Sequence, residues 1–218
     1  MWLDLPARVL FCYDACAVED KPAAGRQHTI EEGRKMNNNL LWHDLTTLGI
    51  EGKGWTDTRN FYDRLPARAE GSVPGPVWNL SLNSAGICAR FTSNATELHA
   101  RWALRNKSLA MPHMPATGVS GIDLYVRVDG TWRWLSVGRP VAFPDNQVQL
   151  CAGLPKGTRD YLLYLPLYNG VTTASLGVPA GASLAAMPNR AERAVVFYGT
   201  SITQGGCASR PGTCHPAI

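Results

Sequence analysis

Two stretches in the middle of the chain alternate strictly between apolar and polar or small residues. Over residues 98–105 and again over 122–129, the even-numbered positions are apolar and the odd-numbered positions mostly are not. A period of two is typical of a β-strand with one buried and one solvated face. The expected inward-facing residues are Leu98, Ala100, Trp102, Leu104, Ile122, Leu124, Val126 and Val128.

Turn signals divide the region from Trp42 to about Ala186 into short strands. Asp129-Gly130 predicts a two-residue hairpin, after which Trp132 and Trp134 return on one face. Asn169-Gly170 predicts a second hairpin between residues 161–168 and 171–178, and Pro166 within its first arm favours an edge strand or a bulge. With further strands over 77–82 and 87–92, about eight strands predict a jelly-roll-like β-sandwich.

The pattern changes after Met187-Pro188-Asn189, where we expect a domain boundary. Residues 195–198 form a continuous apolar run, which predicts a strand buried on both faces, as in a parallel sheet. We therefore divide the chain into a poorly ordered extension over 1–36, a β-sandwich over 37–187, and the start of a second domain over 190–218.

Ser201 lies in the turn that follows this apolar run. Gly199 permits a tight turn, and residues 202–204 can begin a helix, so the hydroxyl of Ser201 would be exposed at the edge of a sheet. A nucleophile suits that place, although small residues also gather at strand–helix turns for steric reasons. Two other motifs do not fit: a nucleophile elbow needs glycine where Thr203 stands, and a phosphate-binding loop needs lysine where Gly206 stands.

The N-terminal extension does not predict a signal peptide. Residues 3–11 are rich in apolar side chains, but Asp4 and Arg8 interrupt them and no basic residue comes before them. Met36 is an alternative start. Of the six cysteines, Cys207 and Cys214 could close a small disulfide loop or remain free thiols, so the compartment stays unknown.

Composition narrows the classes of function. Charged residues make up 17% of the chain and the net charge of +4 is scattered, so we expect no nucleic-acid partner. No apolar stretch is long enough for a membrane-spanning helix, and the cysteines lack zinc spacing, so we expect no membrane, metal or cofactor. His113 on a proline-bound loop has no second ligand near it. Asp123 is expected to accept hydrogen bonds rather than to act as a catalytic acid.

Five tryptophans leave a second interpretation of the sandwich open. At strand period they are either core residues or a platform that stacks on sugar rings. These tryptophans are Trp55, Trp78, Trp102, Trp132 and Trp134.

Two separate motifs resemble those of a known family. The heptad over residues 199–205, Gly-Thr-Ser-Ile-Thr-Gln-Gly, is similar to the first motif of the SGNH (GDSL-type) hydrolases, with Thr200 where many members carry aspartate. The pentad over 121–125, Gly-Ile-Asp-Leu-Tyr, looks like the GxDLY signature of a β-domain that precedes the catalytic domain in one esterase branch. The resemblance covers residues 42–218, and both motifs in the right order are more specific than either alone.

The resemblance implies a β-sandwich followed by an α/β/α domain of flavodoxin-like type. It also implies that Ser201 is the nucleophile, that its backbone N–H serves the oxyanion hole, and that catalysis proceeds through an acyl-enzyme. Related two-domain esterases deacetylate carbohydrates, so the expected substrate is a small ester or an acetylated carbohydrate. A periplasmic or extracellular location would suit the parent enzyme.

The remaining machinery of such a family is not found in the sequence. A Gly-x-Asn motif and an Asp-x-x-His motif would follow the serine, but no aspartate here has histidine three positions later. His215 is the nearest histidine and is expected on an irregular loop. We therefore expect the front part of a longer enzyme, inactive alone. The alternative is a non-catalytic, carbohydrate-binding β-sandwich.

Overall fold

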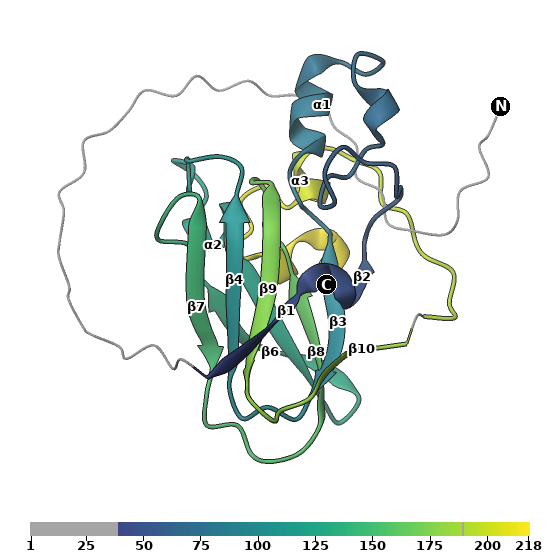
Figure 1. Ribbon diagram of the computed structural model, residues 1–218. Coiled ribbons are helices and arrows are strands. Elements are labelled where there is room, and N and C mark those ends of the chain that lie inside the picture. The colour runs from purple at the N-terminus through teal and green to yellow at the C-terminus, as the bar shows by residue number, and fades with distance from the viewer. Residues whose placement is uncertain (1–38, 189) are drawn as a thin grey trace.

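The computed structural model describes residues 39–188 and 190–218, and it is a sandwich of two antiparallel β-sheets (Figure 1). The mainly β, jelly-roll-like sandwich predicted from the sequence is confirmed. Ten strands lie within the described residues, two more than expected. They are β1 (Leu40–Asp44), β2 (Gly49–Glu51), β3 (Cys88–Ser93), β4 (Leu98–Leu104), β5 (Ile122–Val128), β6 (Thr131–Gly138), β7 (Asp145–Cys151), β8 (Arg159–Tyr164), β9 (Val171–Pro179) and β10 (Leu184–Ala186).

The strands cross repeatedly from one sheet to the other. One sheet has the order β1-β9-β4-β7, and the other has the order β10-β3-β8-β5-β6, with β2 also paired to β3. Apart from the short β2, which pairs with β3, only β5 and β6 are neighbours in both the sequence and a sheet. This alternation is the double Greek key of a jelly roll.

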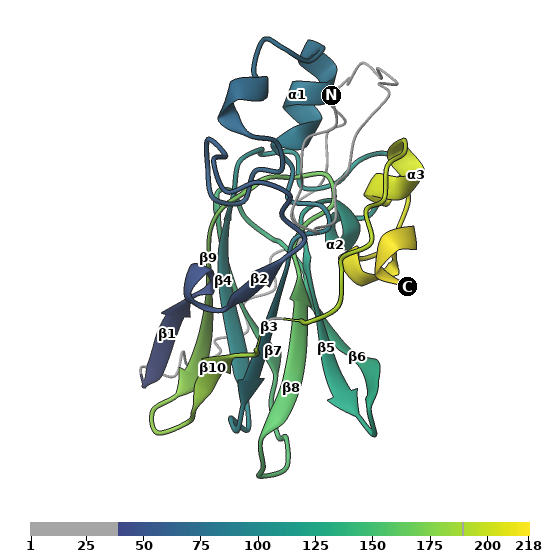
Figure 2. The same ribbon diagram turned by 90° about the vertical axis from the view of Figure 1, so that its right-hand side faces the viewer.

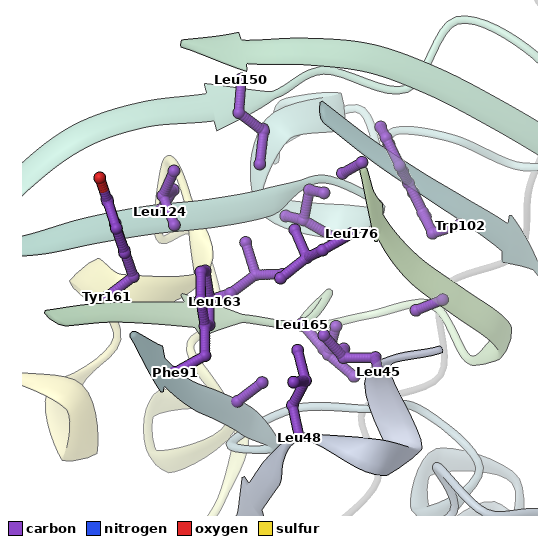
Figure 3. Packing of buried hydrophobic residues seen from close by; sticks show 14 of the residues in the cluster. Leu45, Leu48, Phe91, Trp102, Leu124, Leu150, Tyr161, Leu163, Leu165 and Leu176 are labelled. Carbon is purple, nitrogen blue, oxygen red and sulfur yellow. The ribbon is translucent and has the colours of Figure 1, made fainter. Parts of the chain in front are cut away.

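The core lies between the two sheets, and the alternating residues predicted to face inward supply much of it (Figure 3). Leu98, Leu124 and Leu176 are fully buried, and Trp102 is 2% exposed. The indole Nε1 of Trp102 donates to the carbonyl oxygen of Ser120 at 3.0 Å, so its one polar atom is satisfied. Val128 is the exception to the predicted set, because it lies at the hairpin end of β5 and is 44% exposed.

The Asp129-Gly130 hairpin is confirmed, whereas the Asn169-Gly170 hairpin is wrong. Asp129 and Gly130 have φ of 49° and 78°, as a two-residue turn with both residues left-handed requires, and they join β5 to β6. Asn169 instead lies on a connection between sheets, because β8 and β9 belong to different sheets. Its buried side chain donates to the carbonyl of Asn106 and to the hydroxyl of Ser120.

Two further strand predictions, each near a proline, are wrong. The stretch predicted as a strand over 77–82 is the helix α1 (Gly75–Ser81), with Pro76 in the first turn, where proline favours a helix. Pro166 lies beyond the end of β8, which is an interior strand of its sheet, so it marks neither an edge strand nor a bulge.

The apolar run over residues 195–198 is not a strand in this structure. These residues belong to no sheet, and Val195, Val196 and Tyr198 are 65%, 50% and 77% exposed. A parallel strand is stabilised by neighbours on both edges, and none of the described residues supplies them. The chain nevertheless returns to the sandwich immediately afterwards, from Ser201 onward.

The remaining short elements are α2 (Ala116–Val119), α3 (Ser201–Gln204) and the 3₁₀ helices η1 (Leu45–Thr47), η2 (Ala67–Ala69), η3 (Pro211–Thr213) and η4 (His215–Ala217). Of these, α2 and α3 lie toward the same end of the sandwich as α1 (Figure 2). Among the helices of the described residues, none has the length and apolar character to cross a membrane. The predicted extension over 1–36, including Cys12 and Cys16, falls outside the described residues.

Candidate active site

Ser201 begins the short helix α3 in a sharp turn. The residue before it, Thr200, is extended with φ −89° and ψ −156°, and Gly205 ends the helix in the left-handed region with φ 105°. The side chain of Ser201 is exposed. The turn and helix predicted after Gly199 are therefore present, although the preceding strand is not.

The two glycines of the heptad lie in close contacts. A Cβ at Gly199 would lie 2.1 Å from Oγ1 of Thr203, so the hydroxyl of Thr203 would have to move to admit a side chain here. A Cβ at Gly205 would lie 2.7 Å from both Leu167 Cδ1 and Cys214 Cβ, in addition to the strain of its positive φ. The heptad is thus explained by local packing at both ends.

The segment from Ser201 to Ile218, which we call the C-terminal segment, packs on the sandwich beside α2 and the upper end of β5 (Figure 2). The hydroxyl of Thr117 on α2 donates to the carbonyl oxygen of Ser209 at 2.6 Å. A small second core supports this contact, in which Cys214 is buried together with Met114, Val119 and Leu167.

Asp123 connects the C-terminal segment to the start of β5. It is fully buried on β5, and it accepts hydrogen bonds from the Trp134 indole and from the backbone N–H of Gly212, each at 2.9 Å. Nε of Arg210 lies 3.3 Å from the same carboxylate. The expectation that Asp123 accepts hydrogen bonds is confirmed, and two of its partners come from the C-terminal segment.

Each specified position of the 121–125 pentad has a structural reason. A Cβ at Gly121 would lie 2.4 Å from the carbonyl oxygen of Thr117, so only glycine fits there. Leu124 is fully buried in the main core. The ring of Tyr125 lies against Gly212, where an added Cβ would come within 2.3 Å of it. Together with Asp123, the pentad therefore joins the sandwich core to the C-terminal segment.

Burial raises the pKa of Asp123 from 3.8 to about 6, although Gly212, Arg210 and Trp134 each favour its ionised form. Between pH 4 and 6, the folded protein therefore retains a proton that the unfolded chain has released. Linkage then requires that the contribution of Asp123 to stability is fully present below pH 4 and falls as the pH rises toward 6.

We expect Asp123→Asn to remove this pH dependence. The quantity to follow is the free energy of unfolding of the unmodified chain minus that of the variant. This difference should fall by up to about 3 kcal/mol from pH 4 to pH 7. Urea unfolding of both proteins at a series of pH values measures this difference, and other titrating groups cancel in it. Parallel stability curves over that range would show that Asp123 does not titrate there.

The described residues bring no base to Ser201. Its hydroxyl makes no hydrogen bond to a histidine or carboxylate among residues 39–188 and 190–218. The ring of His215 packs edge-on against Phe197, with centroids 5.6 Å apart. His99 instead lies 3.5 Å from a carboxylate oxygen of Glu97 on the sandwich. The sequence predicted an irregular loop at His215, but His215 begins the 3₁₀ helix η4.

The remaining candidate residues are a histidine, two cysteines and several tryptophans. His113 belongs to no cluster of metal-ligating side chains among residues 39–188 and 190–218. Cys207 and Cys214 are free thiols, the first exposed and the second buried. Of the tryptophans, Trp78 and Trp102 are buried, and Trp134 lies under the guanidinium of Arg210 at 4.9 Å, so these three do not form an open platform.

Three residues that position the Ser201 turn were not identified from the sequence. Buried Gln204 donates through Nε2 to the carbonyl of Leu167 at 2.7 Å, and its Oε1 lies 3.5 Å from a guanidinium nitrogen of buried Arg64. The hydroxyl of Tyr168 donates to the carbonyl of Ser201 at 3.2 Å. These contacts join residues 33 to 140 positions apart, and no local pattern predicts such pairs.

Two family models match this chain. The model described as GxDLY, the N-terminus of SGNH hydrolase-type esterases, matches residues 40–184. A second model, of the GDSL-like lipase/acylhydrolase family, matches residues 192–218, which include Ser201. Among curated proteins, no match was found.

Solved structures give a consistent result. A protein from Bacteroides ovatus ATCC 8483, provisionally described as a GDSL-like lipase, is 31% identical with a TM-score of 0.77, over 82% of this chain and 52% of its own. A salicylyl-acyltransferase from a tetracycline biosynthetic pathway is similar in fold, at 18% identity and a TM-score of 0.51, over 71% of this chain and 44% of its own. The chain thus spans about half the length of the solved structures it matches.

Proposed function

The chain belongs to the SGNH hydrolase-type esterases that carry a GxDLY N-terminal domain, and from this membership we propose that Ser201 is the nucleophile of a serine esterase. The observation that carries the proposal is the exposed serine at the start of α3, in a turn that ends at Gly205, whose positive φ and close contacts favour glycine. The family model that covers residues 192–218 supports the same assignment.

In the proposed reaction, Oγ of Ser201 attacks the carbonyl carbon of an ester. The hydroxyl proton passes to a base, the alcohol leaves with a proton, and the resulting acyl-enzyme is hydrolysed by water. The backbone N–H of Ser201 is proposed as one donor to the oxyanion that forms. We propose an acetylated carbohydrate as the substrate, on the basis of the family resemblance.

We further propose that the 218-residue chain does not turn over esters by itself. Without a hydrogen-bonded base, the serine hydroxyl remains protonated and is a poor nucleophile. Of the described histidines, none forms a hydrogen bond with the hydroxyl of Ser201. In this proposal, residues 37–187 form an accessory sandwich, and residues 190–218 supply the nucleophile to a catalytic domain.

A fusion tests the substrate class. Residues 1–218 are joined to the part of the Bacteroides ovatus protein that lies beyond its matching region, and the fusion is compared with the chain alone. We expect the fusion, but not the chain, to release acetate from acetylated xylo-oligosaccharides and to cleave p-nitrophenyl acetate. Cleavage of the small ester without release of acetate from the oligosaccharides would contradict the proposed substrate class. Ser201-dependent ester hydrolysis by the chain alone would contradict the proposal that the chain is inactive by itself.

A further inference from the structure

The carbonyl oxygen of Ser201 accepts hydrogen bonds from two parts of the molecule. The backbone N–H groups of Gly205 and Gly206 donate to it at 3.0 and 2.6 Å, as at the end of a short helix. The third donor is the hydroxyl of Tyr168, which belongs to the connection between β8 and β9 in the sandwich. The sandwich thus contacts the main chain of the proposed nucleophile directly.

Tyr168 is itself held firmly by its neighbours. Its backbone N–H donates to the carbonyl of Val119 at 3.1 Å, and the N–H of Leu167 donates to the carbonyl of Gly118 at 3.2 Å. The carbonyl of Leu167 accepts from the side chain of Gln204 at 2.7 Å. Residues 167 and 168 therefore hold α3 at both ends, through the carbonyl of Ser201 and the side chain of Gln204.

The phenol of Tyr168 remains a donor at neutral pH. Burial, chiefly, raises its pKa to about 12, so the hydroxyl keeps its proton. The space around this contact is small, because a Cβ at Gly206 would lie 3.2 Å from the Tyr168 hydroxyl oxygen and 3.0 Å from the Ser201 carbonyl oxygen. The glycine leaves room for the tyrosine to approach.

We propose that Tyr168 is a positioning residue for Ser201, through which the GxDLY-type sandwich fixes the orientation of the nucleophile. The inference rests on the proposed function of Ser201. A carbonyl held by three donors fixes the plane of the peptide between Ser201 and Ile202 and, with it, the main chain from which the Ser201 side chain extends. Nucleophiles must be held within a fraction of an ångström of their working geometry, so a contact from a rigid sandwich suits this role.

The test uses the full chain and the variant Tyr168→Phe, which removes only the hydroxyl. The carbonyl ¹³C shift of Ser201, observed through the amide of Ile202 by NMR, should move upfield because one donor is lost. Amide exchange at Gly205 and Gly206 should become about 3- to 10-fold faster, the range that one hydrogen bond of ordinary net strength supports. The melting temperature should change little.

Tyr161→Phe is the matched control, because it removes a tyrosine hydroxyl from the main core rather than from the Ser201 turn. It should leave both signals at residues 201–206 unchanged. Unchanged carbonyl shift and exchange in Tyr168→Phe would overturn the inference, and so would equal changes in the two variants. Neither signal depends on ester hydrolysis, so a failure of the proposed function would appear separately, as hydrolysis that survives Ser201→Ala.

Discussion

Replacing Ser201 with alanine is expected to abolish ester hydrolysis by the fusion that joins this chain to the rest of the Bacteroides ovatus protein. Loss of the nucleophile in serine hydrolases lowers kcat by about 10⁴-fold or more, since only binding and oxyanion stabilisation remain. The initial rate of p-nitrophenyl acetate cleavage, measured against the uncatalysed rate, provides the readout.

Ser209→Ala is the control for this prediction. Ser209 is an exposed serine of the same C-terminal segment, and its hydrogen bond with Thr117 uses the backbone carbonyl, which alanine keeps. The fusion with Ser209→Ala should retain nearly full activity. A fusion that keeps its activity with Ser201→Ala would require a different nucleophile.

Replacing Gly118 with alanine is expected to release the C-terminal segment from the sandwich. The added Cβ would lie 2.2 Å from the carbonyl oxygen of Ala208, and a backbone atom cannot yield as a flexible side chain can. Because Gly118 lies in α2 and its φ is not positive, alanine fits the local backbone, and the clash alone acts. Hydrogen exchange of peptides from 201–214 should become about 5- to 150-fold faster, since overpacking costs roughly 1–3 kcal/mol.

Gly75→Ala provides the comparison for Gly118→Ala. Gly75 lies in α1, and a Cβ added there meets nothing within 4 Å. Exchange of the C-terminal segment should match that of the unmodified chain in this variant. If hydrogen exchange of residues 201–214 is as slow in Gly118→Ala as in Gly75→Ala, the contact between α2 and Ala208 does not hold the C-terminal segment in place.

The sequence predicts the sandwich well because its long strands bury one face against the other sheet. The alternation of apolar and polar residues over 98–105 and 122–129 follows directly from this burial. Asp129-Gly130 determines the turn between β5 and β6 through local backbone preferences. Asn169-Gly170 has the same local preference, yet it connects two sheets. Which strands become neighbours depends on contacts across the whole core, and a dipeptide does not encode them.

The candidate site is only partly predictable for a similar reason. The turn around Ser201 follows from glycines that lie within a few residues of it, and its short helix was expected. The strand over 195–198 was wrong because a strand needs partners, whereas the apolar run reports only the tendency to form one. Tyr168 and Arg64 reach the turn from distant parts of the chain, and no spacing in the sequence indicates these contacts.

The alternation along β5 predicts the direction of the Asp123 side chain but not its burial. On an alternating strand, its position predicted a side chain that faces away from the core between the sheets. The side chain does so, but the C-terminal segment covers it and supplies Gly212 and Arg210 as partners. Alternation therefore predicted which face of β5 Asp123 lies on, whereas its burial depends on a segment 89 residues away in the sequence.

The most direct test of the central claim, that Ser201 is an esterase nucleophile, is to map a covalent adduct on the fusion protein. The active fusion is treated briefly with a fluorophosphonate, digested, and analysed by mass spectrometry. We expect one phosphonyl group on the peptide that contains Ser201, and its formation should parallel the loss of ester hydrolysis. Inactivation with the adduct on any other residue, and an unmodified Ser201, would contradict the account.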